Sequence, residues 1–311
     1  MIMKPMDILT LFPIRKTGKQ KQTFRDSVVP YVQDLGYQVT VEKGSMGAQN
    51  IVIGDSQQAN YLVTAHYDTP ASIGLPNFIT PCNLPFFLIV QILMVGVFFL
   101  AAFIVGLIAS IFTADEGIIF ICAYVGYFGL LFLMMFGPAN RNNANDNTSG
   151  VVTLLQLAAE LPEHLRSQVC FVLFDLEEAG LIGSSSYRKM HKDATEKQIV
   201  LNLDCVGDGD EIVLFPTGKL RKDNEKLSRL DSLAQEREGK KIRIRKKGFS
   251  HCPSDQGSFP YGVGIMAFHR MKGIGIYCDR IHTWRDTILD ENNVRLITDA
   301  LLTFFDSEAA I

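Results

Sequence analysis

NYLVTAHYD, which spans Asn60–Asp68, is the clearest structural signal in the chain. Tyr61–Ala65 is a short and largely apolar run, typical of an interior strand in a sheet that has helices on both faces. His66 and Asp68 follow at the carboxyl end of this strand. Ligands of open α/β sheets bind outside the carboxyl ends of the strands. The stretch therefore predicts an α/β fold with a functional site at that edge of the sheet.

Short apolar strands and amphipathic helices alternate through most of the remaining chain. We expect a mixed, mostly parallel sheet sandwiched between helices. Glu177, Glu178 and Asp204 also fall at predicted strand ends, so the active residues should gather there. Further strands are predicted at 38–44, 50–55, 169–174, in two pieces within 198–215, and at 263–269. Helices are predicted at 23–37 (ending near Gly36), after a cap at 147–149, and at 184–193, 224–239 and 290–305.

Composition narrows the possible functions. The net charge is −3 and no basic tract is long enough to indicate a nucleic-acid partner. The densest basic stretch, Gly239–Gly248, is predicted to be an exposed strand with a charged face, with membrane headgroup contact as the alternative. The six cysteines are far apart and form no CxxC, which favours small buried residues in a reducing compartment. The N-terminal segment lacks the features of a cleavable signal peptide.

Two apolar runs, Leu84–Phe112 and Gly117–Phe136, interrupt this pattern. The only charges within or between them, Asp115 and Glu116, lie in the short connector. A helix that crosses a membrane needs roughly 20 apolar residues. The runs therefore predict a transmembrane helical hairpin, inserted as residues 84–136. The alternative is a buried hairpin of a soluble protein, although a domain of this size rarely hides two helices that are apolar on every side.

Both ends of a hairpin return to the same side of the membrane. Residues 1–83 and 137–311 can therefore fold together as a single discontinuous α/β domain. About 80 residues precede the first apolar run without an export signal, and they include the basic segment Arg15–Arg25. Arg141 follows the second run, whereas the hairpin tip is acidic. This charge asymmetry predicts an integral protein of the cell membrane with its catalytic domain in the cytoplasm.

Five short stretches carry the residues suited to chemistry. Each is weak alone, because a single His or an acidic pair is usually structural. Together they supply two imidazoles and several carboxylates, a donor set that suits Zn²⁺. Three carboxylates and two neutral imidazoles around two Zn²⁺ leave one positive charge, which a bound hydroxide would neutralise. The stretches are AHYDTP (Ala65–Pro70), NANDNTSG (Asn143–Gly150), FDLEEAGLIGS (Phe174–Ser184), NLDCVGDGD (Asn202–Asp210) and RIHTWRDT (Arg280–Thr287).

In this order the five stretches resemble the M28 family of zinc aminopeptidases. The similarity is loose over Asp7–Tyr67 and closer over Asn143–Phe305. It implies the zinc-aminopeptidase-like fold and a site for two Zn²⁺. The implied ligands are His66 and Asp204 for one zinc, Glu178 and His282 for the other, and Asp146 as the bridge.

The same resemblance implies roles for two further acidic residues. Asp68 is similar to the family's carboxylate that orients the first histidine, as a partner behind a metal ligand commonly does. Glu177 resembles the general base that takes a proton from the metal-bridging water and passes it to the leaving amine.

Some positions depart from the family pattern. Asn145 stands where a second acidic residue is usual, and Gln256 stands where a histidine follows Ser-Asp. We expect neither His251 nor His269 to be a metal ligand. The largest departure is the predicted hairpin, which separates the first ligand from the bridging residue.

The leading expectation is a membrane-anchored dizinc aminopeptidase that hydrolyses the N-terminal residues of peptides, through a metal-bridging hydroxide and Glu177 as general base. One alternative is a glutaminyl-cyclase-like acyltransferase that uses a single zinc. Another is a non-catalytic membrane-binding module on the same fold. The expected partners are peptide substrates and the lipid bilayer, and the sequence leaves the oligomeric state open.

Overall fold

The computed structural model describes residues 3–72, 74–75 and 77–310. Within this part of the chain the strands form one ten-stranded sheet, in the order β1-β2-β4-β3-β5-β9-β6-β8-β7, and β10 pairs with β9. The strands are β1 (Val39–Lys43), β2 (Gln49–Ile53), β3 (Tyr61–His66), β4 (Val169–Phe174), β5 (Ile199–Leu203), β6 (Glu211–Pro216), β7 (Gln235–Arg237), β8 (Lys240–Ile244), β9 (Gly262–Met271) and β10 (Gly275–Tyr277).

The centre of the sheet is parallel. Strands β4, β3, β5 and β9 all run in the same direction. Beyond them β2 and β6 pair in the antiparallel sense with β4 and β9, while β6 and β8 are again parallel. The expected mixed sheet is therefore confirmed. Because the carboxyl ends of β4, β3 and β5 meet at one edge, the residues that follow these strands are brought together.

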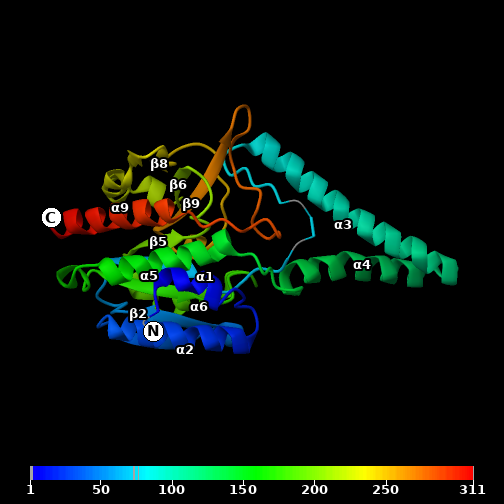
Figure 1. The fold of residues 1–311 in the computed structure, drawn as a ribbon. Coiled ribbons are helices and arrows are strands. Elements are labelled where there is room, and N and C mark those ends of the chain that lie inside the picture. The colour runs from blue at the N-terminus through cyan, green and yellow to red at the C-terminus, as the bar shows by residue number, and fades with distance from the viewer. Residues whose placement is uncertain (1–2, 73, 76, 311) are drawn as a thin grey trace.

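Helices cover both faces of the sheet (Figure 1). Phe24, Leu154 and Phe304, on α2, α5 and α9, share a large buried cluster with one face. Tyr187 of α6 shares a smaller cluster with the other face, which includes Leu62 of β3. The helices are α1 (Ile8–Leu11), α2 (Gly18–Asp34), α3 (Leu84–Phe112), α4 (Glu116–Phe136), α5 (Gly150–Glu160), α6 (Ile182–Met190), α7 (Lys192–Thr195), α8 (Asn224–Arg229) and α9 (Glu291–Ala309).

Two predicted helix boundaries are wrong, each for a local reason. Helix α2 begins at Gly18, earlier than predicted, because Thr17 and Gln20 form a reciprocal capping box at its start. The predicted helix 224–239 ends as α8 at Arg229, and the chain then forms strand β7. Glu238 and Gly239 both have positive φ, 52° and 82°, which is the geometry of a tight two-residue hairpin turn. The β7–β8 hairpin therefore replaces the last turns of the predicted helix.

Strand β8 carries three of the six cations of the basic stretch, and their charges are neutralised within the domain. Lys240 Nζ lies 2.7 Å from Asp290 Oδ2, and Lys241 Nζ lies 3.0 Å from Glu236 Oε1. Arg243 Nε lies 3.3 Å from Glu211 Oε2. For residues 240–244 these pairs favour a charged strand over contact with lipid headgroups, whereas residues 245–247 lie beyond the strand.

Helices α3 and α4 form a hairpin that projects from the α/β part of the molecule (Figure 1). Both are long and apolar enough to cross a membrane, and only 11% and 0% of their most apolar windows are buried. They pack on each other through small residues, because a Cβ at Gly126 would lie 2.8 Å from Val105 Cγ2. The helices meet at the tip and diverge toward the sheet. A core helix of a soluble protein would be buried, so this exposure disfavours the soluble alternative.

Candidate active site

The candidate site lies at the carboxyl edge of the parallel strands. β3 ends at His66, and β4 leads into the loop that carries Glu177 and Glu178. Asp204 directly follows β5. Asp146 lies in the turn before α5, and His282 lies in a loop after β10. The backbone of His282 has a φ of +60°, a conformation uncommon outside glycine.

These side chains form two groups that share one carboxylate. His66 Nε2 lies 3.4 Å from Asp146 Oδ1 and 3.7 Å from Asp204 Oδ1. His282 Nε2 lies 3.0 Å from Asp146 Oδ2 and 3.9 Å from Glu178 Oε2. In each group of three, the candidate ligand atoms all lie within 4.8 Å of one another. The two oxygens of Asp146 thus face two separate sets of donors.

Asp68 holds the acidic loop in position beside His66. Its Oδ1 and Oδ2 accept hydrogen bonds from the backbone N–H groups of Glu177 (3.1 Å) and Glu178 (3.2 Å). Oδ1 also lies 3.5 Å from His66 Nδ1. One buried carboxylate therefore orients both the first histidine and the loop that carries the proposed base.

Asp286 performs a similar role for Asp146, and the sequence analysis did not single it out. Its Oδ1 accepts from the backbone N–H of Asn145 at 2.8 Å, and its Oδ2 accepts from that of Asp146 at 3.0 Å. Burial and the charge of Asp146 raise the pKa of Asp286 to about 7. The sequence signal that could have identified Asp286 is its position four residues after His282, within the stretch Arg280–Thr287.

A buried arginine supports the site from behind. Arg15 is fully buried, and its Nη2 donates to Thr148 Oγ1 at 3.1 Å in the turn that carries Asp146. Its backbone N–H donates to Thr69 Oγ1 at 2.9 Å, just beyond β3. A buried charge is retained only where hydrogen bonds compensate its desolvation. Arg15 therefore links the segments that carry the first ligand and the bridging carboxylate.

The positions that depart from the family pattern serve structural roles. The Oδ1 of Asn145 accepts from the backbone N–H of Gly207 at 2.7 Å, so this side chain is engaged away from the candidate ligands. The Oε1 of Gln256 accepts from Asn202 Nδ2 at 3.1 Å. His251 packs against Phe87, with 4.9 Å between ring centroids and the rings tilted by 54°. Among the described residues, neither His251 nor His269 joins a group with metal-ligand geometry.

Negative charge exceeds positive charge in the site. Burial raises the pKa of Glu177 well above its usual range, and nearby carboxylates, Glu178 foremost, raise it further. Burial is also the main cause that raises the pKa of Glu178 to about 8. Burial lowers the pKa of His282, but Glu178 and Asp146 outweigh this effect and raise the pKa to about 9. Cations bound among these groups would offset the same excess charge.

The donor set fits zinc. Imidazole nitrogens and carboxylate oxygens are common zinc ligands, and each group offers three of them, as catalytic zinc sites do. Asp204 Oδ1 is buried and has no hydrogen-bond partner among the residues that the structure describes. A metal ion would satisfy this oxygen, which otherwise carries an unpaired desolvation cost.

A model of peptidase family M28 matches residues 130–304. This segment is more than half of the chain, and it includes all the candidate ligands except His66. The chain belongs to peptidase family M28. Membership confirms the expected enzyme class, a zinc metallopeptidase, and implies peptide substrates for this M28 peptidase.

Solved structures share the fold of this M28 peptidase at low sequence identity. A glutaminyl cyclase from Porphyromonas gingivalis has 17% identity and a TM-score of 0.58, over 96% of this chain and 93% of that chain. A Zn-dependent exopeptidase from Parabacteroides distasonis has 14% identity and a TM-score of 0.59, over 94% and 92% of the two chains. The LapA aminopeptidase of Legionella pneumophila has 12% identity and a TM-score of 0.58, over 97% and 67%. No curated protein matches the sequence.

A cavity of about 160 Å³ opens onto the candidate ligands of the M28 peptidase. Apart from the candidate ligands, the wall of this cavity is largely apolar. Ile79 forms part of this wall, and it belongs to the segment that connects β3 to α3. Ile79 is held in place, because its backbone and that of Cys278 exchange hydrogen bonds of 2.8 and 3.0 Å. The other apolar or sulfur-bearing residues of the wall are Cys205, Cys252, Pro253, Met266, Ala267, Phe268, Cys278 and Ile281.

Proposed function

We propose that this chain is a dizinc aminopeptidase that is anchored to a membrane by the α3–α4 hairpin. The observation that carries the proposal is the pair of three-residue ligand groups that share Asp146. One group adds His66 and Asp204, and the other adds Glu178 and His282. A single metal would not require both groups, whereas a carboxylate whose two oxygens face two donor sets suits a pair of neighbouring metals.

The residues of this chain divide the chemistry as follows. Zinc, when bound, polarises the scissile carbonyl and lowers the pKa of water at the site. Glu177, next to the ligand Glu178 on the same loop, accepts the proton from the attacking water and returns it to the leaving amine. Asp68 fixes the direction of Glu177 through the backbone of the loop.

The cavity supports removal of one residue at a time from the amino end of a peptide. Its volume of about 160 Å³ leaves room for a single side chain beside the ligand groups. The apolar wall around Ile79 and Phe268 favours an apolar first side chain. The carboxylates of the site would attract the positively charged amino terminus of the peptide.

Membrane anchoring is supported by the length, composition and exposure of α3 and α4. We treat 1–83 and 137–311 as one discontinuous domain, because β3 lies between β4 and β5 in the sheet although the hairpin separates it from them in sequence. The proposed cytoplasmic orientation depends on fewer charges than the sequence suggested. Within Arg15–Arg25, the cations of Arg15, Lys21 and Arg25 are buried and bonded inside the domain. Arg141, by contrast, remains at the surface beside the second span.

Cyclisation of N-terminal glutamine is the second candidate, favoured by the fold similarity to the glutaminyl cyclase of Porphyromonas gingivalis. This reaction would use a single zinc and release ammonia instead of an amino acid. The aminopeptidase is favoured because both ligand groups are intact. The group of His66, Asp146 and Asp204 is present together with the group of Asp146, Glu178 and His282.

One experiment separates the two activities. Purified full-length protein with a measured zinc content is incubated with a panel of dipeptides and aminoacyl chromophores, with and without a chelator. We expect chelator-sensitive release of the first amino acid, fastest for apolar residues. Release of ammonia from glutaminyl peptides alone would support the cyclase. Absence of both products from zinc-loaded protein would support the non-catalytic module.

A further inference from the structure

Four segments, one of which includes strand β10, surround the bases of α3 and α4, where the hairpin leaves the domain. They contain Lys and Arg but no Asp or Glu, although the whole chain has a net charge of −3. We call them together the root surface, and they comprise residues 137–145, 245–251, 271–277 and 280–285. Three of their cations pair with acidic residues outside the segments, namely Lys246 with Asp231, Arg280 with Asp208 and Arg285 with Asp279. The tip of the hairpin, by contrast, carries Asp115 and Glu116. The two ends of the predicted spans therefore differ in charge.

The base of α4 combines cations with an exposed tryptophan. Trp284 is the only tryptophan of the chain and is 75% exposed. The side chain of Asn142, six residues after the end of α4, donates a hydrogen bond to the carbonyl of Trp284. Arg141 is exposed and forms no ion pair within the described residues. Lys16 Nζ donates to the carbonyl of Met135, in the last turn of α4, at 3.1 Å.

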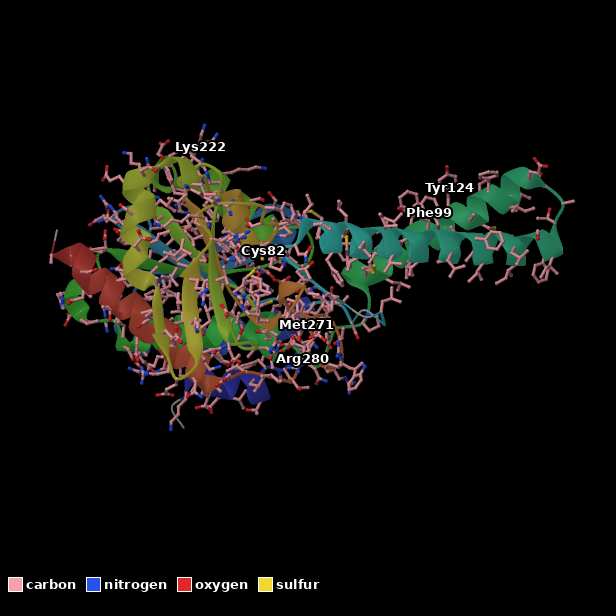
Figure 2. All side chains as sticks on the ribbon, turned by 90° about the horizontal axis from the view of Figure 1, so that it is seen from above. Cys82, Phe99, Tyr124, Lys222, Met271 and Arg280 are labelled. Carbon is pink, nitrogen blue, oxygen red and sulfur yellow. The ribbon has the colours of Figure 1, made fainter. Side chains whose placement is uncertain are left out.

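The base of α3 has a similar composition. Asn83, which caps α3, donates to the carbonyl of Ile274 at 2.8 Å and so places the β9–β10 turn beside the helix. Met271 and Lys272 are exposed in this turn. Figure 2 shows the labelled Met271 and Arg280 on the side of the domain from which the hairpin leaves.

A second loop completes the base of α3. Phe249 is 36% exposed, and its ring centroid lies 6.1 Å from that of Phe87 in the first turn of α3. Lys247 is exposed beside it and forms no ion pair in the part of the chain that the structure describes. Unlike the lysines of β8, Lys247 and Arg141 have no acidic partner there.

We propose that the root surface lies against the headgroup layer of a membrane that contains anionic lipids, with Trp284 in the interface. This inference rests on the proposed anchoring by the hairpin. Tryptophan favours the boundary between apolar chains and water, because its ring is apolar and its N–H is polar. Each Lys or Arg near an anionic leaflet adds an attraction that salt weakens.

The proposed contact also places the active site. His282, a candidate zinc ligand, is two residues from Trp284 in the same loop. Ile79, in the cavity wall, belongs to the segment that enters α3. The cavity would therefore lie just above the headgroup layer, where peptides bound to the membrane surface are concentrated.

The single tryptophan makes the contact directly measurable. The full-length protein is reconstituted into phosphatidylcholine vesicles, with and without phosphatidylglycerol, and the emission of Trp284 is recorded. We expect emission shifted to shorter wavelength, quenching by lipids brominated near the headgroup, and protection from iodide in water. Emission typical of water-exposed tryptophan, with quenching by iodide alone, would overturn the proposal.

Charge reversal tests the choice of lipid. Arg141→Glu should lose most of the quenching that depends on phosphatidylglycerol, and added salt should reduce the same component in the unmodified protein. Lys197→Glu, at an exposed position two residues before β5 and so at the opposite edge of the sheet, makes a matching charge reversal away from the root surface and should have no effect. Equal quenching in both variants would contradict a contact with anionic headgroups.

Failure of anchoring and failure of the surface contact are distinguishable. Flotation of the vesicles after an alkaline wash reports whether the hairpin is inserted. Protein that does not float contradicts the anchoring and, with it, the contact. Protein that floats but has a water-exposed Trp284 contradicts the contact alone. Peptide hydrolysis, assayed in detergent, tests the proposed chemistry independently of both.

Discussion

Glu177 and Glu178 are adjacent in sequence but have different proposed tasks. Glu178 lies 3.9 Å from His282 within one ligand group. Glu177 also falls within 4.8 Å of His66 in a third grouping of possible donors. The backbone N–H groups of both residues are bound by Asp68, so their directions are set by a single carboxylate. At the residue scale the site therefore depends on carboxylates that orient the backbone as much as on the ligands.

The Glu177→Gln variant tests the proposed general base. Glutamine keeps the shape of the side chain but cannot accept a proton, so we expect turnover to fall by about 10²–10⁴-fold. Zinc content should remain unchanged, because Glu177 belongs to neither of the two groups that share Asp146. Steady-state kinetics and metal analysis provide the two readouts. Glu163→Gln, at an exposed position, is the matched control, and activity that survives in Glu177→Gln would refute the assignment.

The Asp286→Asn variant tests the positioning residue that holds the bridging carboxylate. Asparagine leaves only one oxygen for the two backbone N–H groups that Asp286 binds. Loss of a partner behind a metal ligand commonly costs about 10–100-fold in metal affinity or activity. We expect a loss of this size in zinc affinity, measured by competition with a chelator. Asp299→Asn on α9 is the control, and equal effects of the two changes would indicate a general loss of stability.

The hairpin is the element that distinguishes this chain from a compact enzyme domain. Within the described residues, its contacts with the domain are concentrated at its base, where Asn83 and Phe87 meet loops and Lys16 meets the end of α4. Only 11% of the apolar window of α3 and none of that of α4 is buried. The sheet and its core clusters are formed without the hairpin, apart from the ends that connect to it.

Removal of residues 84–136, with a short Gly/Ser bridge in their place, should therefore yield a soluble domain. We expect this domain to bind zinc and to retain the helix and strand content of the parent. Gel filtration in the absence of detergent, circular dichroism and metal analysis measure the outcome. A protein that fails to fold with several bridge lengths would indicate that the hairpin contributes to the stability of the catalytic core.

At the scale of the whole molecule, the site links segments from both sides of the hairpin. His66 precedes the hairpin, whereas the other four candidate ligands follow it. Metal binding would therefore join the two parts of the discontinuous domain, in addition to the parallel pairing of β3 with β4 and β5. A ligand that binds only the folded state raises the free energy of unfolding. Well above the dissociation constant, this gain grows with the logarithm of the free ligand concentration.

Metal removal tests this coupling. We expect two zinc ions per chain, and dialysis against a chelator should abolish hydrolysis and lower the melting temperature. Re-addition of zinc should restore both, and the melting temperature should rise with zinc concentration. A plateau at one zinc per chain would favour the cyclase-like site. A chain that binds none and is unaffected by the chelator would favour the non-catalytic module.

The sequence by itself determined most of the elements around the site and the donor set. Tyr61–His66 has the apolar composition and the length of a buried strand. Leu84–Phe112 is a continuous apolar run, and its ends coincide with those of α3. Such properties are local, so they can be predicted without knowledge of the contacts between distant segments. The family's order of motifs likewise identified the candidate ligands, which the structure brings together.

Only the tertiary structure decided which side chains share a partner. Asp286 holds the backbone at Asp146 across 140 residues of sequence, and Arg15 reaches the same turn from the N-terminal segment. The β7–β8 hairpin overrides a helical pattern because β8 pairs with β6 and gives β7 an edge to join. Burial and pairing between distant segments determine these outcomes, and neither has a local signature in the chain.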